Sequence, residues 1–202
     1  LTETEINQVY NFDFTKSLRL DNARDLFIIG LRTGLRVSDF LQLKNIDINK
    51  GFIEIETTKT NETVIIPLHS QVKAIIEKNN NKLPRSISDQ NFNLYIKEIC
   101  KDAGITETVK GAIVNPETKR KEIGRYEKYK LVSSHTCRRS FASNLYGNLP
   151  NMVIMAITGH KTETSFLKYI KITKKEHAET LKRYWSKEQE DKGYTNVLRA
   201  VK

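Results

Sequence analysis

The sequence has 202 residues, and its 34 Lys and Arg against 24 Asp and Glu give a formal net charge of +10. That length fits one domain or two small ones, and a hydrophobic fraction of 38% is enough to form a core. No apolar run approaches the ~18 residues of a membrane-spanning helix, which excludes a membrane protein. The positive excess suits a polyanionic partner.

The two cysteines, Cys100 and Cys137, stand alone in the sequence. Their spacing fits neither a disulfide scaffold nor a cysteine-based zinc site. No export signal precedes the first helix, so we expect a cytoplasmic protein with reduced thiols. No residue set argues for Mg²⁺ or Zn²⁺, and we expect no metal and no cofactor.

Three helices are predicted at the start of the chain. Thr2 and Glu5 form a capping box that opens the first helix. Asp21 can cap a second helix, which ends at Gly34, and Ser38 can cap a short third one. The apolar stripe of the second helix comprises Ala23, Leu26, Phe27, Gly30 and Leu31.

The clearest β signal lies in residues 52–57 and 64–68, where apolar and polar residues alternate. This pattern predicts a hairpin with Lys59 near its tip. Two helices follow, joined by a linker over residues 79–88, and Gly104 ends the second of them. Residues 106–132 are rich in Lys and Arg with little periodicity, so we expect an irregular hairpin or a mobile loop.

The C-terminal third is predicted to be helical. Helices are expected to begin at Ser134, Asn151 and Thr173, and Gly147 and Gly159 end the first two. A short helix carrying Tyr169 lies before the last one, and the chain after Ser186 is mostly polar. The predicted fold class is mainly α with one small antiparallel β-sheet.

His135 and Arg138 share a face of their helix because they are three residues apart. Arg138 also lies close to the apolar stripe of its own helix, which carries Phe141 and Leu145. A guanidinium near such a stripe needs an anionic partner. A phosphate at the first helical turn would satisfy it, since free N–H groups and the helix dipole favour an anion there. Taken singly, these two residues, like Arg36, His160, Tyr169 and Lys59, also fit ordinary structural or surface roles.

The order of these segments is more specific than any one of them. They read TGLRVSD at 33–39, Lys59 and IPL at 66–68, HTCRRSFA at 135–142, TGH at 158–160 and Tyr169 nine residues after His160. This series resembles the catalytic domain of the tyrosine recombinases, the phage integrase family. The resemblance covers residues 1–185, and residues 135–170 look most like integrases of bacterial mobile elements such as conjugative transposons.

The resemblance implies a role for each residue of the series. Arg36 and Arg138 would clamp the scissile phosphate, and Tyr169 would be the nucleophile. The i, i+3 spacing from His135 favours Arg138 over Arg139 for this role. The remaining roles are His135 as general base, Lys59 as general acid, His160 as hydrogen-bond donor to the phosphate, and Asp39 as the carboxylate that holds the pocket. Three other lysines could lie nearer to the site than Lys59: Lys44, Lys50 and Lys73.

The implied function is a site-specific DNA recombinase or integrase that cleaves and rejoins strands through a 3′-phosphotyrosyl intermediate without metal or ATP. The implied partner is double-stranded DNA, held by a homotetramer that can be a monomer without DNA, with accessory directionality proteins, in the bacterial nucleoid. We expect residues 1–185 to be the catalytic domain and 186–202 a tail that docks on a neighbouring subunit or is disordered. An N-terminal DNA-binding domain is expected outside this sequence.

Two other functions stay open at this stage. The chain could be a non-catalytic DNA-binding module that holds phosphates through its positive charge and the basic run at 119–130. It could also be a topoisomerase-like enzyme that cuts and rejoins one strand. An intact set of site residues argues against the binding module, and supercoil relaxation without recombinant product would identify the topoisomerase.

Overall fold

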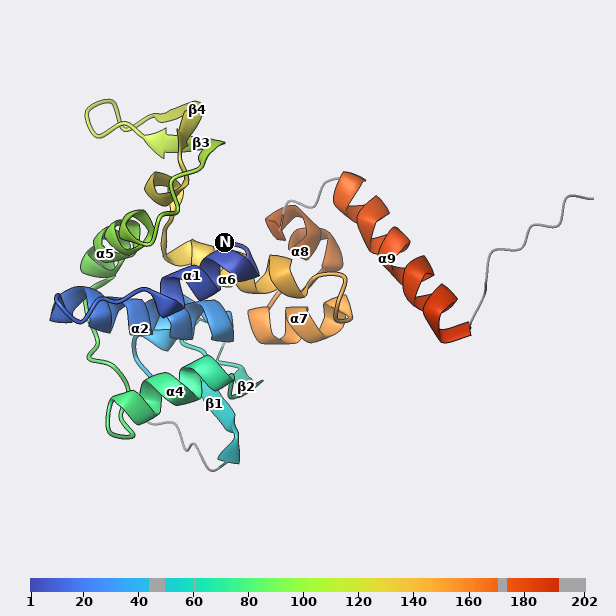
Figure 1. Cartoon of the computed structure of the whole chain (residues 1–202), viewed down its shortest axis with the longest axis horizontal. Coiled ribbons are helices and arrows are strands. Elements are labelled where there is room, and N and C mark those ends of the chain that lie inside the picture. Colours follow the sequence, from blue (N-terminus) through green and yellow to red (C-terminus); the bar gives the residue numbers. More distant parts are fainter. Residues whose placement is uncertain (44–49, 60, 171–173, 193–202) are drawn as a thin grey trace, which may run out of the picture.

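A computed structural model describes residues 1–43, 50–59, 61–170 and 174–192 of the chain (Figure 1). The helices are α1 (Glu3–Asn11), α2 (Leu18–Thr33), α3 (Val37–Phe40), α4 (Ser70–Lys78), α5 (Asp89–Asp102), α6 (Ser134–Leu145), α7 (Asn151–Thr158), α8 (Glu163–Ile170) and α9 (Lys174–Lys192), with a 3-10 turn, η2 (Lys128–Leu131). The strands are β1 (Phe52–Glu56), β2 (Thr63–Pro67), β3 (Thr108–Val114) and β4 (Lys121–Glu127). The predicted mainly helical class is confirmed.

Helix α2 runs through the middle of the molecule and contacts α1, α4, α5 and α6 (Figure 1). The sequence predicted one buried stripe, but Ile28 and Ile29 outside that stripe are buried as well. A helix surrounded by others must be apolar nearly all round. Its two buried charged residues, Arg24 and Asp25, pair with each other at 2.8 Å. Helix α2 therefore forms the frame on which the other elements are placed.

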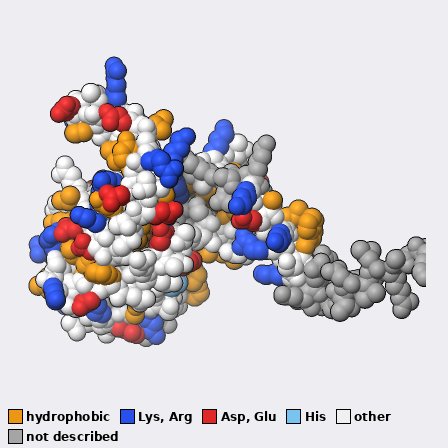
Figure 2. All heavy atoms as spheres, turned by 45° about the horizontal axis from the view of Figure 1, so that its top comes forward, with side chains coloured by type: hydrophobic (Ala, Val, Ile, Leu, Met, Phe, Trp, Pro, Cys, Tyr) orange, Lys and Arg blue, Asp and Glu red, His pale blue; other side chains and the backbone are white. Residues whose placement is uncertain are grey.

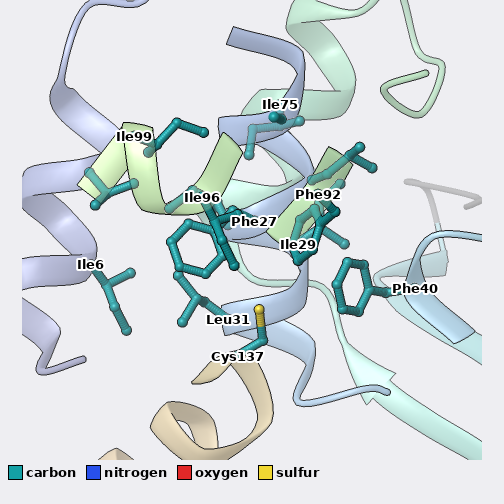
Figure 3. Close-up of a cluster of buried hydrophobic side chains, with 14 of the residues drawn as sticks. Ile6, Phe27, Ile29, Leu31, Phe40, Ile75, Phe92, Ile96, Ile99 and Cys137 are labelled. Carbon is teal, nitrogen blue, oxygen red and sulfur yellow. The ribbon is translucent and has the colours of Figure 1, made fainter. Parts of the chain in front are cut away.

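The main core gathers around α2, with side chains from α1, α4, α5 and α6 packed against it (Figure 3). Phe92 lies edge-on to both Phe27 and Phe40, with ring centroids 6.1 and 5.4 Å away. Cys137 of α6 points into this core beside Leu31 (Figure 3). Because Cys137 is fully buried, it fixes the orientation of the first turns of α6, and with it the position of Arg138.

A second, smaller hydrophobic cluster joins α6, α7 and α8. Among the described residues its buried members are Ala142, Ile154, Phe166 and Ile170. Tyr169 packs against this cluster as a partly buried neighbour. The short helix that carries Tyr169 is thus anchored by far fewer buried side chains than α2.

The described strands form two separate two-stranded antiparallel sheets, where the sequence predicted one. Strands β1 and β2 pair from Phe52↔Pro67 to Glu56↔Thr63, which confirms the predicted hairpin. Strands β3 and β4 also pair in a continuous register, so a hairpin is present within 106–132 as predicted, but it is regular and neither irregular nor a mobile loop. Gly111 lies against the Leu131 side chain, and this packing supports the ribbon in the absence of a strong apolar alternation.

Several helix starts differ from the prediction by one to a few residues. Helix α2 begins after Ser17, a turn before Asp21. Helix α3 is capped by Arg36, so Ser38 lies inside it. Ser133 caps α6 through reciprocal hydrogen bonds with Thr136, and Ser134 is its first residue. These shifts follow from caps that depend on backbone conformation as much as on residue type.

The other predicted boundaries fall close to the observed ones. Pro150 precedes α7, and Gly104 and Gly147 follow the caps of α5 and α6 by one residue. The predicted cap at Thr173 lies outside the described residues, as do residues 193–202. Helix α9 continues past Ser186 to Lys192, where the sequence predicted a tail. Within the described ranges, no helix has both the length and the apolar character that crossing a membrane requires.

Candidate active site

An open pocket of about 290 Å³ lies where the start of α3, the first turns of α6, the end of α7 and helix α8 meet. Its lining comprises Leu35, Arg36, Val37, Ser38, Ser134, His135, Arg138, Thr158, Gly159, His160 and Tyr169. Five of the six predicted catalytic residues are therefore brought together, although they come from distant parts of the sequence. The sixth, Lys59, does not line this pocket.

Arg138 forms the floor of the pocket and is only 7% exposed. Its Nη1 donates a hydrogen bond of 2.8 Å to the backbone oxygen of Gly34. Burial and the neighbouring Arg36 guanidinium lower the pKa of Arg138 to about 10. No carboxylate of the described residues lines the pocket, and the nearby Asp39, which acts to raise the pKa of Arg138, forms no ion pair with it in the described structure. This buried cation can therefore attract an anion.

Gly34 makes that arrangement possible. It ends α2 in the left-handed conformation, with φ of +64°, a region that favours glycine. A Cβ atom at this position would lie 2.4 Å from the Phe141 ring, so only glycine lets α6 approach this closely. The same residue thus turns the chain toward Arg36 and offers its carbonyl group to Arg138.

Arg36 stands directly after this turn, as the half-buried cap of α3. The guanidinium groups of Arg36 and Arg138 both lie close to Gly159, on the other side of the pocket. A methyl group at Gly159 would lie 3.7 Å from Nη2 of Arg138 and 3.8 Å from Nη2 of Arg36. Two guanidinium groups over one glycine create a strongly positive hollow suited to a phosphate.

His160 follows Gly159 and is held by the Thr158 side chain. The Thr158 hydroxyl donates to the Ile154 carbonyl oxygen at 2.7 Å and lies 2.8 Å from Nδ1 of His160. Because its single proton is used, the hydroxyl accepts from Nδ1–H, and Nε2 is then left for the pocket. Burial, Arg138 and Arg36 all lower the pKa of His160.

Tyr169 closes the pocket from α8. Its ring lies 4.9 Å from the His160 ring, and its hydroxyl oxygen is buried without a hydrogen-bond partner among the described residues. Burial raises the pKa of Tyr169, while Arg138, Arg139 and Arg36 act to lower it. A buried polar group without a partner is costly, so the hydroxyl lies in a position that a bound ligand could satisfy.

His135 lies in the first turn of α6 and is exposed at the rim of the pocket. Asp39, by contrast, is 2% exposed and sits one turn after Arg36. Its Oδ1 accepts a hydrogen bond of 3.0 Å from the backbone N–H of Thr58, and Oδ2 is buried without a partner in the described structure. Asp39 therefore ties the α3 start to the β1–β2 turn.

Lys59 is exposed in that β1–β2 turn, next to the residue that Asp39 holds. The alternatives offer no better fit: Lys50 and Lys73 are also exposed and do not line the pocket, and Lys44 lies outside the described residues. Lys73 is instead 3.9 Å from Glu77. The described residues contain no group of His, Cys, Asp or Glu that could hold a metal ion.

Residues 1–177 match the family model described as the phage integrase family. The chain belongs to the phage integrase family. A search of curated proteins gives no match.

Solved structures agree in fold with this integrase-family domain. XerA recombinase superimposes with a TM-score of 0.63 at 15% identity, over 91% of this chain and 62% of that one. The lambda integrase catalytic core gives 0.55 at 17%, over 79% and 90%. The Tn1549 transposon integrase in complex with transposon right end DNA gives 0.55 at 15%, over 90% and 63%. The domain thus spans under two thirds of the XerA and Tn1549 chains, and its tyrosine recombinase catalytic-domain fold is confirmed.

Three contacts in the integrase-family pocket were not anticipated from the sequence. They are the Thr158 contact to His160, the Thr58 N–H bond to Asp39, and Arg139 over the Tyr169 ring. The Thr158–His160 contact lies within the TGH segment and could have been expected from that motif. The Thr58–Asp39 and Arg139–Tyr169 contacts join segments that are far apart in the sequence, and no spacing rule connects them.

Proposed function

We propose that this chain is the catalytic domain of a site-specific DNA recombinase that cleaves and rejoins DNA strands through Tyr169, without metal or ATP. The proposal rests on one observation above all. The buried, unpartnered hydroxyl of Tyr169 borders the same pocket as two arginines whose charge no lining carboxylate balances. Membership of the phage integrase family supports the same chemistry.

In the proposed first step, Oη of Tyr169 attacks the phosphorus of one DNA strand, and the bond from phosphorus to the 5′ oxygen breaks. Negative charge grows on the non-bridging oxygens as five groups surround the phosphorus. Arg36 and Arg138 stabilise that charge, and their fixed positions mean that little reorganisation is needed. The phosphotyrosyl ester keeps the bond energy, so the reverse attack by a 5′ hydroxyl rejoins a strand without ATP.

Two proton transfers complete the step. His135, at the pocket rim, takes the phenolic proton, and Lys59 gives a proton to the departing 5′ oxygen. Lys59 has to approach from the exposed β1–β2 turn, and the bond between Asp39 and Thr58 keeps that turn beside the α3 start. His160 donates from Nε2 to the phosphate, which requires the doubly protonated ring because Nδ1–H is engaged by Thr158.

The proposed partner is double-stranded DNA. A solved neighbour of this fold is described as XerH recombinase bound to difH substrate, which supports the proposal. On the face seen in Figure 2, Lys and Arg side chains are scattered over the body and the projecting β3–β4 hairpin rather than gathered into one patch. The basic side chains of this face therefore do not mark a DNA site by themselves, and the proposal rests on the two arginines of the pocket. The tetramer, the directionality proteins, the domain limits and the cytoplasmic, nucleoid location remain predictions.

A randomised pool of duplex DNA tests the reaction. Each duplex carries a sulfur atom in place of the bridging 5′ oxygen, because a thiol leaves without a general acid and cannot easily rejoin. The wild-type chain is expected to form a covalent protein–DNA adduct, visible on a denaturing gel, whose peptide map shows DNA on Tyr169. Sequencing the trapped strands would reveal the preferred site.

Tyr169→Phe is the decisive variant. It is expected to abolish the adduct while sparing DNA binding, and an adduct that persists in this variant contradicts the proposal. Lys59→Ala sharpens the test, since it should slow cleavage of normal DNA but not of the sulfur-containing duplex. Binding without any adduct in the wild type would favour a non-catalytic module. Relaxation of supercoils without recombinant product would favour a topoisomerase.

A further inference from the structure

Arg139 lies beside the proposed nucleophile but has no role in the steps above. It follows Arg138 in α6, so its side chain leaves the helix in a different direction and is exposed. Its Cζ atom lies over the Tyr169 ring, 5.5 Å from the centroid. That distance is within the ~6 Å at which a guanidinium is attracted to the face of an aromatic ring.

Within the described part of the chain, the Arg139 guanidinium forms neither an ion pair nor a hydrogen bond that would compete with its contact to Tyr169. This separates it from Arg19, which also lies over a tyrosine ring, Tyr95 at 4.9 Å, but is held by a salt bridge to Glu98. Among the described residues, the Tyr169 ring is thus the electrostatic partner of the charged end of Arg139.

The ring is otherwise lightly held. Helix α8 is packed on α6 and α7 through the small cluster, and the Tyr169 hydroxyl has no hydrogen bond. The Arg139 cation and the His160 ring, 4.9 Å away, therefore hold the Tyr169 side chain in place where hydrogen bonds do not. Turning the ring about its own axis leaves the hydroxyl oxygen where it is, but swinging the side chain about the Cα–Cβ bond, away from these two contacts, would carry that oxygen out of the pocket.

We propose that Arg139 is a positioning residue for Tyr169: its guanidinium packs on the ring face, holds the phenol toward the two arginines and stabilises the phenolate. The consequence for catalysis rests on the proposed function, whereas the effect on the phenol does not. The charged and titratable groups around the phenol are Arg138, Arg139 and Cys137 of α6, Arg36 before α3, and His160 after α7. Of these, Arg139 is the cation placed over the ring.

The first measurement concerns the phenol in the free protein. The full chain is labelled with a fluorinated tyrosine, whose more acidic phenol ionises at lower pH, and each ring is followed by ¹⁹F NMR during a pH titration. The Tyr169 signal among the 8 tyrosines is assigned with Tyr169→Phe. Arg139→Gln removes the cation but keeps a side chain of similar length, so Tyr169 is expected to ionise at higher pH than in the wild type. Arg139→Lys keeps a cation and should restore the wild-type titration.

Arg19→Gln is the matched control, because it is the same substitution over a tyrosine ring outside the pocket. It should leave the Tyr169 titration unchanged. If Tyr169 ionises at the same pH in Arg139→Gln and in the wild type, the inference is wrong. If Arg139→Lys behaves like Arg139→Gln, a cation is not what matters, and the inference is wrong as well.

The second measurement is the rate of adduct formation on the sulfur-containing duplex as a function of pH. Arg139→Gln is expected to be slower by about two- to fivefold, with the rise of the rate shifted to higher pH, and Arg139→Lys to recover most of the rate. A uniform loss at every pH together with weaker DNA binding would assign Arg139 to DNA contact and overturn the inference. If Tyr169→Phe still formed an adduct, the proposed function would fail while the titration result stood.

Discussion

The arginine side and the tyrosine side of the pocket are supported by hydrophobic clusters of very different size. Arg36 and Arg138 stand at the edge of the main core, where Gly34 and Cys137 lock the end of α2 against α6. His160 follows the end of α7 and Tyr169 lies on α8, and the small cluster of Ala142, Ile154, Phe166 and Ile170 holds these two helices together. Within the described chain, the arginine side is thus supported by the large core and the tyrosine side by the small cluster.

This difference fits the chemistry proposed for the site. Stabilising growing charge requires donors that are fixed before the reaction, because rearranging them costs energy in the transition state. A nucleophile has to reach the phosphorus and leave with it, so some freedom of its helix is useful. Local stability in proteins varies in this way, and moving segments come from the weakly packed end.

Replacing one buried phenylalanine in each hydrophobic cluster with alanine tests the comparison most strongly. Phe27→Ala and Phe166→Ala both empty fully buried positions, and each should cost about 3–5 kcal/mol where the site cannot collapse. Phe27→Ala is expected to lower the free energy of unfolding of the whole domain. Phe166→Ala should instead speed amide hydrogen exchange mainly in α7 and α8. Equal loss of protection in α2 for both variants would mean that the two clusters unfold as one unit.

Removing the buried guanidinium tests the arginine side alone. Arg138→Met should slow adduct formation by about 100- to 1000-fold, as expected for a lost donor to a growing charge. It should also abolish sulfate binding, measured by NMR titration, while secondary structure is retained by circular dichroism. Arg125→Met, on the exposed β3–β4 ribbon, is the control and should leave sulfate binding as in the wild type. Unchanged sulfate affinity in Arg138→Met would show that the anion binds elsewhere.

A smaller effect is expected from pH at His160. Burial, Arg138 and Arg36 lower the pKa of His160 below its usual value, so the ring is neutral near pH 7. An anion offsets the two arginines and accepts from Nε2–H, which raises that pKa. The protonated ring binds the anion better than the neutral ring. Sulfate affinity should therefore fall as the pH rises from the pKa of His160 without sulfate to its higher pKa with sulfate bound, by at most about tenfold per pH unit. Calorimetry in buffers of different ionisation enthalpy should record proton uptake.

The matched variant for that experiment is His160→Gln, which should bind sulfate more weakly but lose the pH dependence. Thr158→Val removes the acceptor of Nδ1–H, so the neutral ring can carry its proton on Nε2 and the dependence on pH should flatten. Sulfate affinity that is constant with pH in the wild type would show that His160 does not donate to the anion.

Local patterns in the sequence predicted most of the helices and the β1–β2 hairpin. The capping box at Thr2 and the left-handed ends at Gly34 and Gly159 depend only on neighbouring residues, and all three are confirmed. Six site residues were expected to gather because the motif order resembles a known family, and all of them except Lys59 line one pocket. Residue spacing within helices and strands could not have predicted that Arg36 and Arg138 lie close together.

The failures have a common physical origin. The β3–β4 pairing depends on packing against Leu131, and the all-round burial of α2 depends on four partner helices, so neither can be seen in a short window. The same holds for Arg139, whose ring contact needs the relative placement of α6 and α8. Lys59 was assigned through the resemblance, and its exposed turn reaches the site only through the backbone bond to Asp39.

Cys137 is buried one residue before Arg138, so the rate at which its thiol is labelled reports how often the interface between α2 and α6 opens. Burial raises the pKa of its thiol, so it is protonated and inert as long as α6 stays on α2. A thiol reagent can label it only when that interface opens. In a Cys100→Ala background, which removes the other thiol, the labelling rate would count those openings directly. The rate could then be followed as sulfate or DNA fills the pocket.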